Sequence, residues 1–263
     1  RQRLLRTQGP DTRHVTADRA CSPSPRHNGR MKYSVVILPI VVPVLFWAWY
    51  HYYKDRHLPE PVGHLFLAFL LGGVAFALGK LLYAGLGLVG LRFDAFLLAD
   101  TDRTALFLYA ILAIGPIEEI AKLVPFLLVI RHFPEFDEPI DGIIYASFIA
   151  LGFAAVENFF YLQFLTSGES LARGFVGPVV HIVFASIWGY YVGRACLNRR
   201  RLIATVIVSV GVTALIHGFY DYLVIAMPRF ALPASAVIVA CLWLWRMFLI
   251  RDLHAAAKDS AGG

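Results

Sequence analysis

Two adjacent carboxylates interrupt one of the most apolar stretches of the chain. Glu118 and Glu119 lie between Leu106 and Ile130, and Lys122 follows within one helical turn. Spacings of three and four residues let the lysine neutralise one of the two acids on its own helix. A packing ion pair would account for that acid alone. The other carboxylate, in apolar surroundings without a cation of its own, is suited to act as a general acid or base.

Further polar residues interrupt the later apolar stretches. Glu157 stands in one stretch and His181 in the next, while His217 and Asp221 are four residues apart in a third. That spacing places the last two on one helical face, where the aspartate can orient the histidine or both can bind a metal such as zinc. The alternatives are structural. Glu157 can pair with His181 or Lys80, and His181 can be an interfacial histidine near a helix start.

Long helices are needed to hold these residues, and the apolar runs of the chain predict such helices. The 263-residue sequence is 58% hydrophobic and 16% charged, and a run of about 20 apolar residues is long enough to cross a bilayer as a helix. We predict an all-α, polytopic helical membrane bundle of about seven transmembrane helices. The expected spans are 33–53, 62–89, 104–130, 140–165, 178–197, 202–223 and 234–250.

The chain divides into one large region and two short ends. Residues 31–252 are expected to form the helical transmembrane domain. Residues 1–30 are polar, contain seven arginines and precede Met31, so we expect a disordered tail or an upstream extension that is not native to the protein. Residues 253–263 are expected to be a short disordered tail.

The distribution of charge predicts the orientation in the membrane. Without residues 1–30, seven spans leave ten lysines and arginines on one side and five on the other. The side with ten is expected in the cytoplasm, which puts the amino terminus outside. Glu118, Glu157, His181 and His217 then have depths that let them meet in the outer half of the membrane. The net charge of +6 falls to about +1 without residues 1–30, so no basic surface indicates nucleic acid as a partner.

Three ordered motifs resemble the signatures of the PrsW family of intramembrane proteases. They are Glu118-Glu119-x-x-Lys122, Phe153-x-x-x-Glu157-Asn158 and His217-x-x-x-Asp221. Pro59-Glu-Pro61, Asp141-Gly-Ile-Ile-Tyr145 and His181 also look similar, and the likeness runs over roughly residues 55–225. The related CAAX prenyl proteases and bacteriocin-processing membrane proteases carry an arginine at a longer spacing and a histidine where this chain has Glu157. Cleavage of prenylated peptides is therefore less expected.

The resemblance implies a multi-pass protease of the cell (cytoplasmic) membrane. Its partners would be the lipid bilayer and a single-span membrane protein such as an anti-sigma factor, cleaved on the outer side. We predict that Glu118 activates a water to attack a peptide carbonyl. The candidate catalytic residues are Glu118, Glu119, Lys122, Glu157, His217 and Asp221, and the candidate metal ligands are Glu157, His181, His217 and Asp221. A divalent metal, zinc first, is the expected cofactor, and a metal-free site in which the same groups position water and stabilise the oxyanion is the alternative.

Two other classes of protein also place ionisable residues inside a membrane. One is an ion- or proton-coupled transporter, in which such groups form a relay. The sequence has no visible inverted repeat of the kind that many transporters carry. The other is a non-catalytic membrane-protein binder, which would have no need for intact motifs. Both observations favour the protease.

Overall fold

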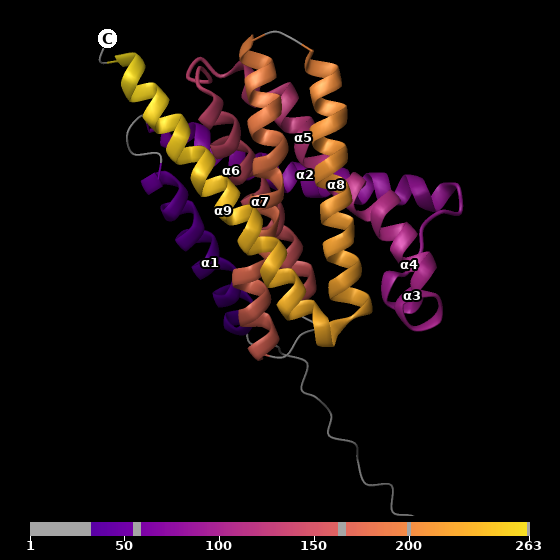
Figure 1. Cartoon of the computed structure of the whole chain (residues 1–263). Helices are drawn as coiled ribbons and strands as arrows, with labels where there is room; N and C mark the ends of the chain where they lie inside the picture. Colours follow the sequence, from indigo (N-terminus) through magenta and orange to yellow (C-terminus); the bar gives the residue numbers. More distant parts are fainter. Residues whose placement is uncertain (1–32, 55–58, 163–166, 199–200, 262–263) are drawn as a thin grey trace, which may run out of the picture. The chain divides into compact units, whose positions relative to one another are not determined.

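Helices make up the architecture of the residues that this computed structural model describes, which are 33–54, 59–162, 167–198 and 201–261 (Figure 1). The α-helices in chain order are α1 (Tyr33–Lys54), α2 (Val62–Leu88), α3 (Ala95–Thr101), α4 (Arg103–Tyr109), α5 (Gly115–Leu128), α6 (Pro139–Tyr161), α7 (Ser167–Asn198), α8 (Leu202–Ala226) and α9 (Pro228–Ala261). A π-helical turn (Ala110–Ile114) joins α4 to α5, and a 3-10 turn (Ile130–His132) follows α5. The all-α prediction is confirmed over these ranges.

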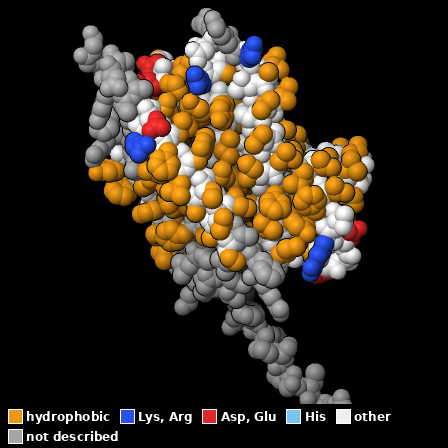
Figure 2. All heavy atoms as spheres, in the orientation of Figure 1, with side chains coloured by type: hydrophobic (Ala, Val, Ile, Leu, Met, Phe, Trp, Pro, Cys, Tyr) orange, Lys and Arg blue, Asp and Glu red, His pale blue; other side chains and the backbone are white. Residues whose placement is uncertain are grey.

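Several of these helices have the properties of membrane spans. α2, α6, α8 and the part of α7 from Arg173 to Asn198 are long and apolar enough to cross a bilayer. Figure 2 shows apolar side chains over most of the viewed face, with charged side chains at its margins. A surface of this kind suits contact with lipid rather than water. The chain is therefore a multi-pass membrane protein, and the total of about seven spans stays a prediction.

α6 and α7 form the centre of the unit that residues 32–263 make up. Every residue of α6 from Ile140 to Ala154 is buried. α2 and α5 pack on α6, α8 packs on α5 and α7, and both α1 and α9 lie along α7 (Figure 1). A Cβ atom on Gly152 of α6 would collide with the carbonyl of Phe69 in α2. The small residue therefore permits the close helix approach that its sequence context predicts.

Two glycines bring the backbones of α5 and α8 into contact beside the polar motifs. A Cβ atom on Gly115 would collide with the carbonyl of Ala214, and one on Gly218 would collide with the carbonyl of Ala110. Any larger residue at either position would push the two helices apart. Because His217 directly precedes Gly218, this contact places its side chain against α5.

The third expected span, 104–130, is one helical path with an irregularity in its middle. α4 ends at Tyr109, and the wider π-helical turn follows before α5 begins at Gly115. Pro116 has no N–H, so the carbonyl four residues earlier loses its helical donor. A π-helical turn directly before the proline accommodates that loss, and such turns are frequent at functional sites. The helix is therefore loosened directly before Glu118 and Glu119.

The ends of the chain differ from the expectations in one respect. α9 continues through Ala261, across most of the stretch 253–263 that was expected to be disordered. Three consecutive alanines at 255–257 have the highest helix propensity of any residue type, so the helix extends past its apolar part. The expectation for residues 1–30 lies outside the described residues.

Candidate active site

The expected site residues lie on four helices that meet at one place in the bundle. Each is buried except Asp221, which is partly exposed. Every one of them lies within 4.0 Å of another through a hydrogen bond or an ion pair. We call this set the acid–base cluster, and its members are Glu118, Glu119 and Lys122 of α5, Glu157 of α6, His181 of α7, and His217 and Asp221 of α8.

Glu119 is the carboxylate of the adjacent pair that the surrounding structure satisfies. Lys122 Nζ and His217 Nδ1 each donate to Glu119 Oε1 at 2.6 Å. Trp188 Nε1 donates to Glu119 Oε2 at 2.8 Å. Both oxygens of this fully buried side chain are therefore engaged by three donors, one of them a full cation. Charge-assisted hydrogen bonds of this kind hold a carboxylate in place.

Glu118 has the opposite environment. Its Oε2 atom is buried and has no hydrogen-bond partner among the described residues. The same atom lies 3.7 Å from His217 Nε2 and 4.0 Å from His181 Nδ1. A buried polar atom without a partner costs about 1–3 kcal/mol, and such an atom in a folded protein calls for a bound water, ion or substrate group. Glu119 is thus positioned by the protein, and Glu118 is available for chemistry.

The neighbours of His217 decide which of its ring nitrogens carries the hydrogen. The Glu119 carboxylate can only accept, so His217 Nδ1 donates, and in the neutral imidazole Nε2 keeps its lone pair. That lone pair has Glu118 Oε2 at 3.7 Å and Asp221 Oδ2 at 3.6 Å. An imidazole fixed through one nitrogen by a carboxylate, with the other nitrogen open, is the usual arrangement of a metal-binding histidine.

His181 is held through both of its ring nitrogens. Lys122 Nζ donates to His181 Nδ1 at 3.1 Å, and His181 Nε2 donates to Glu157 Oε2 at 2.9 Å. Arg173 Nη2 lies 3.4 Å from the same oxygen of Glu157, and its guanidinium stacks over the ring of Tyr161 at 4.4 Å. Because the Arg173 side chain is 32% exposed, this chain of contacts leads from the buried lysine towards the surface.

The charges of this region do not balance among the described residues. Four carboxylates face two permanent cations, Lys122 and Arg173. With neutral histidines the formal excess is two negative charges. Buried charge without compensation is costly, so a divalent cation or bound protons would offset this excess.

Three residues of the cluster are spaced to hold one metal ion. Ligand atoms of Glu118, His181 and His217 all lie within 4.8 Å of one another, and carboxylate oxygen with imidazole nitrogen is a donor set that zinc accepts. The unpartnered Glu118 oxygen, the open Nε2 of His217 and the negative excess all fit a divalent cation.

This triad differs from the ligand set expected from sequence. Glu157 is engaged by His181 and Arg173 rather than open, while Asp221 stays beside the triad at His217 Nε2. Coordination by His181 Nδ1 would require that nitrogen to release Lys122. Lys80, the alternative partner of Glu157, is exposed and lies over the ring of Phe76.

Sequence reasoning did not single out two residues that contact the cluster. Trp188 holds Glu119, and Arg173 pairs with Glu157. Trp188 follows His181 by two helical turns on α7, so their shared helix face was the available signal. Arg173 belongs to no motif in the sequence, and its contact with Glu157 on another helix has no local signature.

A separate polar contact joins two segments that also carry the resemblance. The Tyr145 hydroxyl donates to Glu60, and Asp141 accepts from the backbone N–H groups of Asp137 and Glu138 at the start of α6. Burial raises the pKa of Glu60 above its ordinary value, and the hydrogen bond from Tyr145 opposes that effect. This contact anchors the segment before α2 to α6.

Comparisons with known proteins agree with the motifs. A family whose description is "PrsW family intramembrane metalloprotease" matches residues 60–248, a range that includes the whole acid–base cluster. Protease PrsW of Clostridioides difficile is 30% identical over 222 residues, which cover 81% of this chain and 88% of that protein. Protease PrsW of Oceanobacillus iheyensis is 28% identical over 80% of this chain and 92% of its own length. The protein of that name from Bacillus subtilis is 29% identical, with coverages of 68% and 77%. No solved structure matches the chain significantly.

Proposed function

The chain belongs to the PrsW family of intramembrane metalloproteases, and we propose that it hydrolyses a peptide bond of a single-span membrane protein with Glu118 as the proton acceptor. One observation carries this assignment. Glu118 Oε2 is buried without a hydrogen-bond partner and faces two histidines, whereas Glu119 is engaged by three donors. A general base must have a free lone pair beside the water that it activates.

The reaction requires two proton transfers. Glu118 takes a proton from water as the water oxygen bonds to the peptide carbonyl carbon. The same proton then passes to the leaving amine nitrogen as the C–N bond breaks. Lys122 and Glu119 keep their charges paired throughout, and Glu119 holds His217 with Nε2 towards the reacting groups. Glu157 orients His181 through Nε2.

The residues that would hold a divalent cation, zinc first, are Glu118, His181 and His217, with Asp221 beside them. Bound there, it would polarise the peptide carbonyl and make the attacking water more acidic. A carboxylate has two oxygens, so Glu118 can serve such a cation through one and accept the proton through the other. In the metal-free alternative, His217 and Asp221 position the water and stabilise the oxyanion.

The family resemblance supports a proposal for the substrate class and for the location of the protein. The substrate class would be a membrane-anchored regulator such as an anti-sigma factor, and the location would be the cell (cytoplasmic) membrane. The excess of lysine and arginine on one side of the predicted spans supports an orientation with the acid–base cluster in the outer half of the bilayer. Cleavage is then expected near the outer end of the substrate's span.

The decisive experiment is cleavage of a single-span test substrate by the purified full chain in lipid vesicles. Glu118→Gln should lower the rate by about 10²–10⁴-fold, the usual contribution of a general base, while the protein stays folded. Asp252→Asn removes an exposed carboxylate whose described partner is the adjacent Arg251, and this control should cleave at the rate of the parent. An unchanged rate in Glu118→Gln would remove Glu118 from the chemistry.

Metal dependence needs its own measurement. Elemental analysis of active protein should find about one metal per chain, and His217→Ala should lower that content together with activity. Full activity with well under one metal per chain, unaffected by chelator, would favour the metal-free alternative. Ion flux through vesicles without any substrate cleavage would favour the transporter instead.

A further inference from the structure

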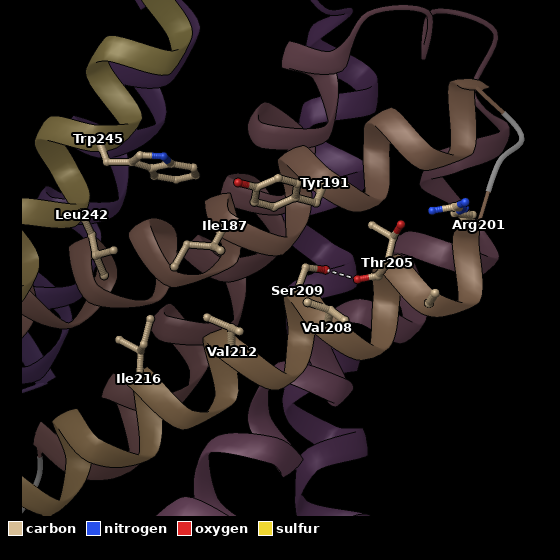
Figure 3. Close-up of a pocket in the computed structure, with 11 residues that line it drawn as sticks. Ile187, Tyr191, Arg201, Thr205, Val208, Ser209, Val212, Ile216, Leu242 and Trp245 are labelled. Atoms are coloured by element: carbon tan, nitrogen blue, oxygen red, sulfur yellow. Dashed lines mark hydrogen bonds between the residues drawn. The ribbon is translucent and has the colours of Figure 1, made fainter.

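An apolar groove lies between α7, α8 and α9, on another face of α8 than His217 (Figure 3). Its volume is about 690 Å³. The α8 wall runs from Ala204 to Ile216, α7 contributes Ile187 and Tyr191, and α9 contributes Leu242 and Trp245. The Ser209 hydroxyl in this wall donates to the Thr205 carbonyl of its own helix at 2.7 Å. The lining is mainly apolar, and the Ser209 hydroxyl is already satisfied within its own helix.

One end of the groove carries a positive charge. Arg201 lines it at the start of α8, where its backbone adopts a left-handed conformation (φ 50°). Its side chain is exposed and has no ion-pair partner among the described residues. Arg194 lies on the last turns of α7 at the same end of the bundle. A guanidinium is a fixed cation that pairs well with phosphate, so the groove combines a cationic mouth with an apolar channel.

The length and the charge of the groove suit a phospholipid. Fifteen residues separate Arg201 from Ile216, which is about 22 Å of helix, and the lining between them is mainly apolar. The guanidinium at one end complements a phosphate. A substrate span that is apolar along its length would leave this cation without a partner.

We propose that this groove is a binding site for one anionic phospholipid. An acyl chain lies along α8 between Tyr191 and Trp245, and the phosphate of the headgroup pairs with Arg201. Basic residues at the ends of membrane helices attract anionic lipids, with about 1 kcal/mol for each arginine near the surface. The lipid fills the space between α8 and α9 on the face that lies away from the acid–base cluster. It therefore supports the helix that carries His217 without entering the reaction.

Lipid binding to the delipidated full chain, measured by native mass spectrometry and by thermal unfolding, tests this site. Phosphatidylglycerol should bind at one molecule per chain and raise the unfolding temperature, with about fivefold preference over phosphatidylcholine. Arg201→Gln should abolish the preference. Arg251→Gln removes an exposed arginine outside the groove and should keep it. Equal binding of the two lipids by the parent, or a preserved preference in Arg201→Gln, would overturn the assignment.

A second pair of variants tests the apolar channel. Ala204 lines the groove, so Ala204→Trp should fill it and abolish retention of both lipids. Ile207→Trp is the matched control, because Ile207 is an exposed α8 residue outside the lining, and it should bind like the parent. Lipid retention in Ala204→Trp would exclude the channel. Two further results would replace the lipid with another occupant. An equal stabilisation by glycerol 3-phosphate alone would indicate a phosphate ligand without an acyl chain. A loss of substrate-peptide binding in Ala204→Trp, with lipid retained, would indicate a peptide.

Discussion

The acid–base cluster and the surroundings of Arg246 are two buried polar regions on the same central helices, and they treat charge in opposite ways. In the cluster, each charged group has an oppositely charged or ionisable neighbour. Arg246 of α9 is fully buried but donates to two neutral hydroxyls, Ser186 Oγ of α7 at 2.8 Å and Ser147 Oγ of α6 at 3.2 Å. No ion pair of Arg246 occurs within the described part of the chain, and its Nη1 atom is buried without a partner.

The difference shows what each region can do. Charged groups that share hydrogen bonds can exchange a proton, because a change of charge on one group is offset by a change on its neighbour. A cation among hydroxyls has no such exchange. The hydroxyls also do not depend on it, since Ser147 donates to the Ile143 carbonyl at 2.6 Å and Ser186 donates to the Ile182 carbonyl at 2.7 Å. The cluster therefore has an arrangement that suits proton transfer, whereas Arg246 links α9 to α6 and α7 at a cost in desolvation.

The largest effect on stability should come from a broken charge pair inside the cluster. Glu119→Gln leaves Lys122 buried without its anion, so the free energy of unfolding should fall by about 3–5 kcal/mol, and activity should fall with it. Adding Lys122→Met should restore most of the stability but not the activity, because His217 remains misplaced. Thermal unfolding and cleavage assays on the two variants measure both. If the double variant were no more stable than Glu119→Gln, the charges would not be coupled as the comparison requires.

A smaller effect is expected at the edge of the cluster. Arg173→Gln removes the partly exposed partner of Glu157, so stability should change by under about 1 kcal/mol. Cleavage should slow by about tenfold, equivalent to about 1.4 kcal/mol, since Glu157 loses the cation that holds it against His181. The quantity to compare is the loss of cleavage rate against the loss of stability. A large loss of stability with normal cleavage would make Arg173 a structural residue.

Arg246→Met should stabilise the protein, in contrast to the two changes above. The methionine keeps the apolar stem and removes a buried cation without an ionic partner, so stability should rise by about 1 kcal/mol, or about 2–4 °C in unfolding temperature. Cleavage should stay within about twofold of the parent. A clear loss of stability would show that the two serine contacts outweigh the desolvation of the cation, and the contrast between the regions would then fail.

The smallest effect concerns Glu60, which is buried in the segment just before α2. Because its folded-state pKa is raised above the ordinary value of 4.5, the folded protein binds the proton more tightly than the unfolded chain. Stability should therefore fall as the pH rises from about 4.5 through the raised pKa. Glu60→Gln should flatten this dependence and keep the contact with Tyr145. Unfolding temperatures of both proteins across that pH range give the slopes, and identical slopes would exclude Glu60 as their source.

Local patterns in the sequence were enough to predict the class of fold and to select the residues of the acid–base cluster. The apolar runs predicted helical membrane segments because chain length and hydropathy alone decide what can cross a bilayer. The spacing of Glu118, Glu119 and Lys122 predicted one paired acid and one available acid, because neighbours on a helix are set by its periodicity. The spacing of His217 and Asp221 predicted their contact in the same way.

Tertiary structure decided everything that depends on contacts between helices. Spacing along α5 cannot tell which glutamate is free, because both lie within reach of the same lysine. Glu119 is the engaged one, because Trp188 of α7 and His217 of α8 donate hydrogen bonds to it. The spacing of the candidate metal ligands, the Arg173 contact, the Arg246 link and the groove beside α8 have the same origin. Each depends on how closely helices pack, as Gly115 and Gly218 illustrate where they let α5 and α8 approach. Such distances are a property of the packed bundle rather than of any one helix.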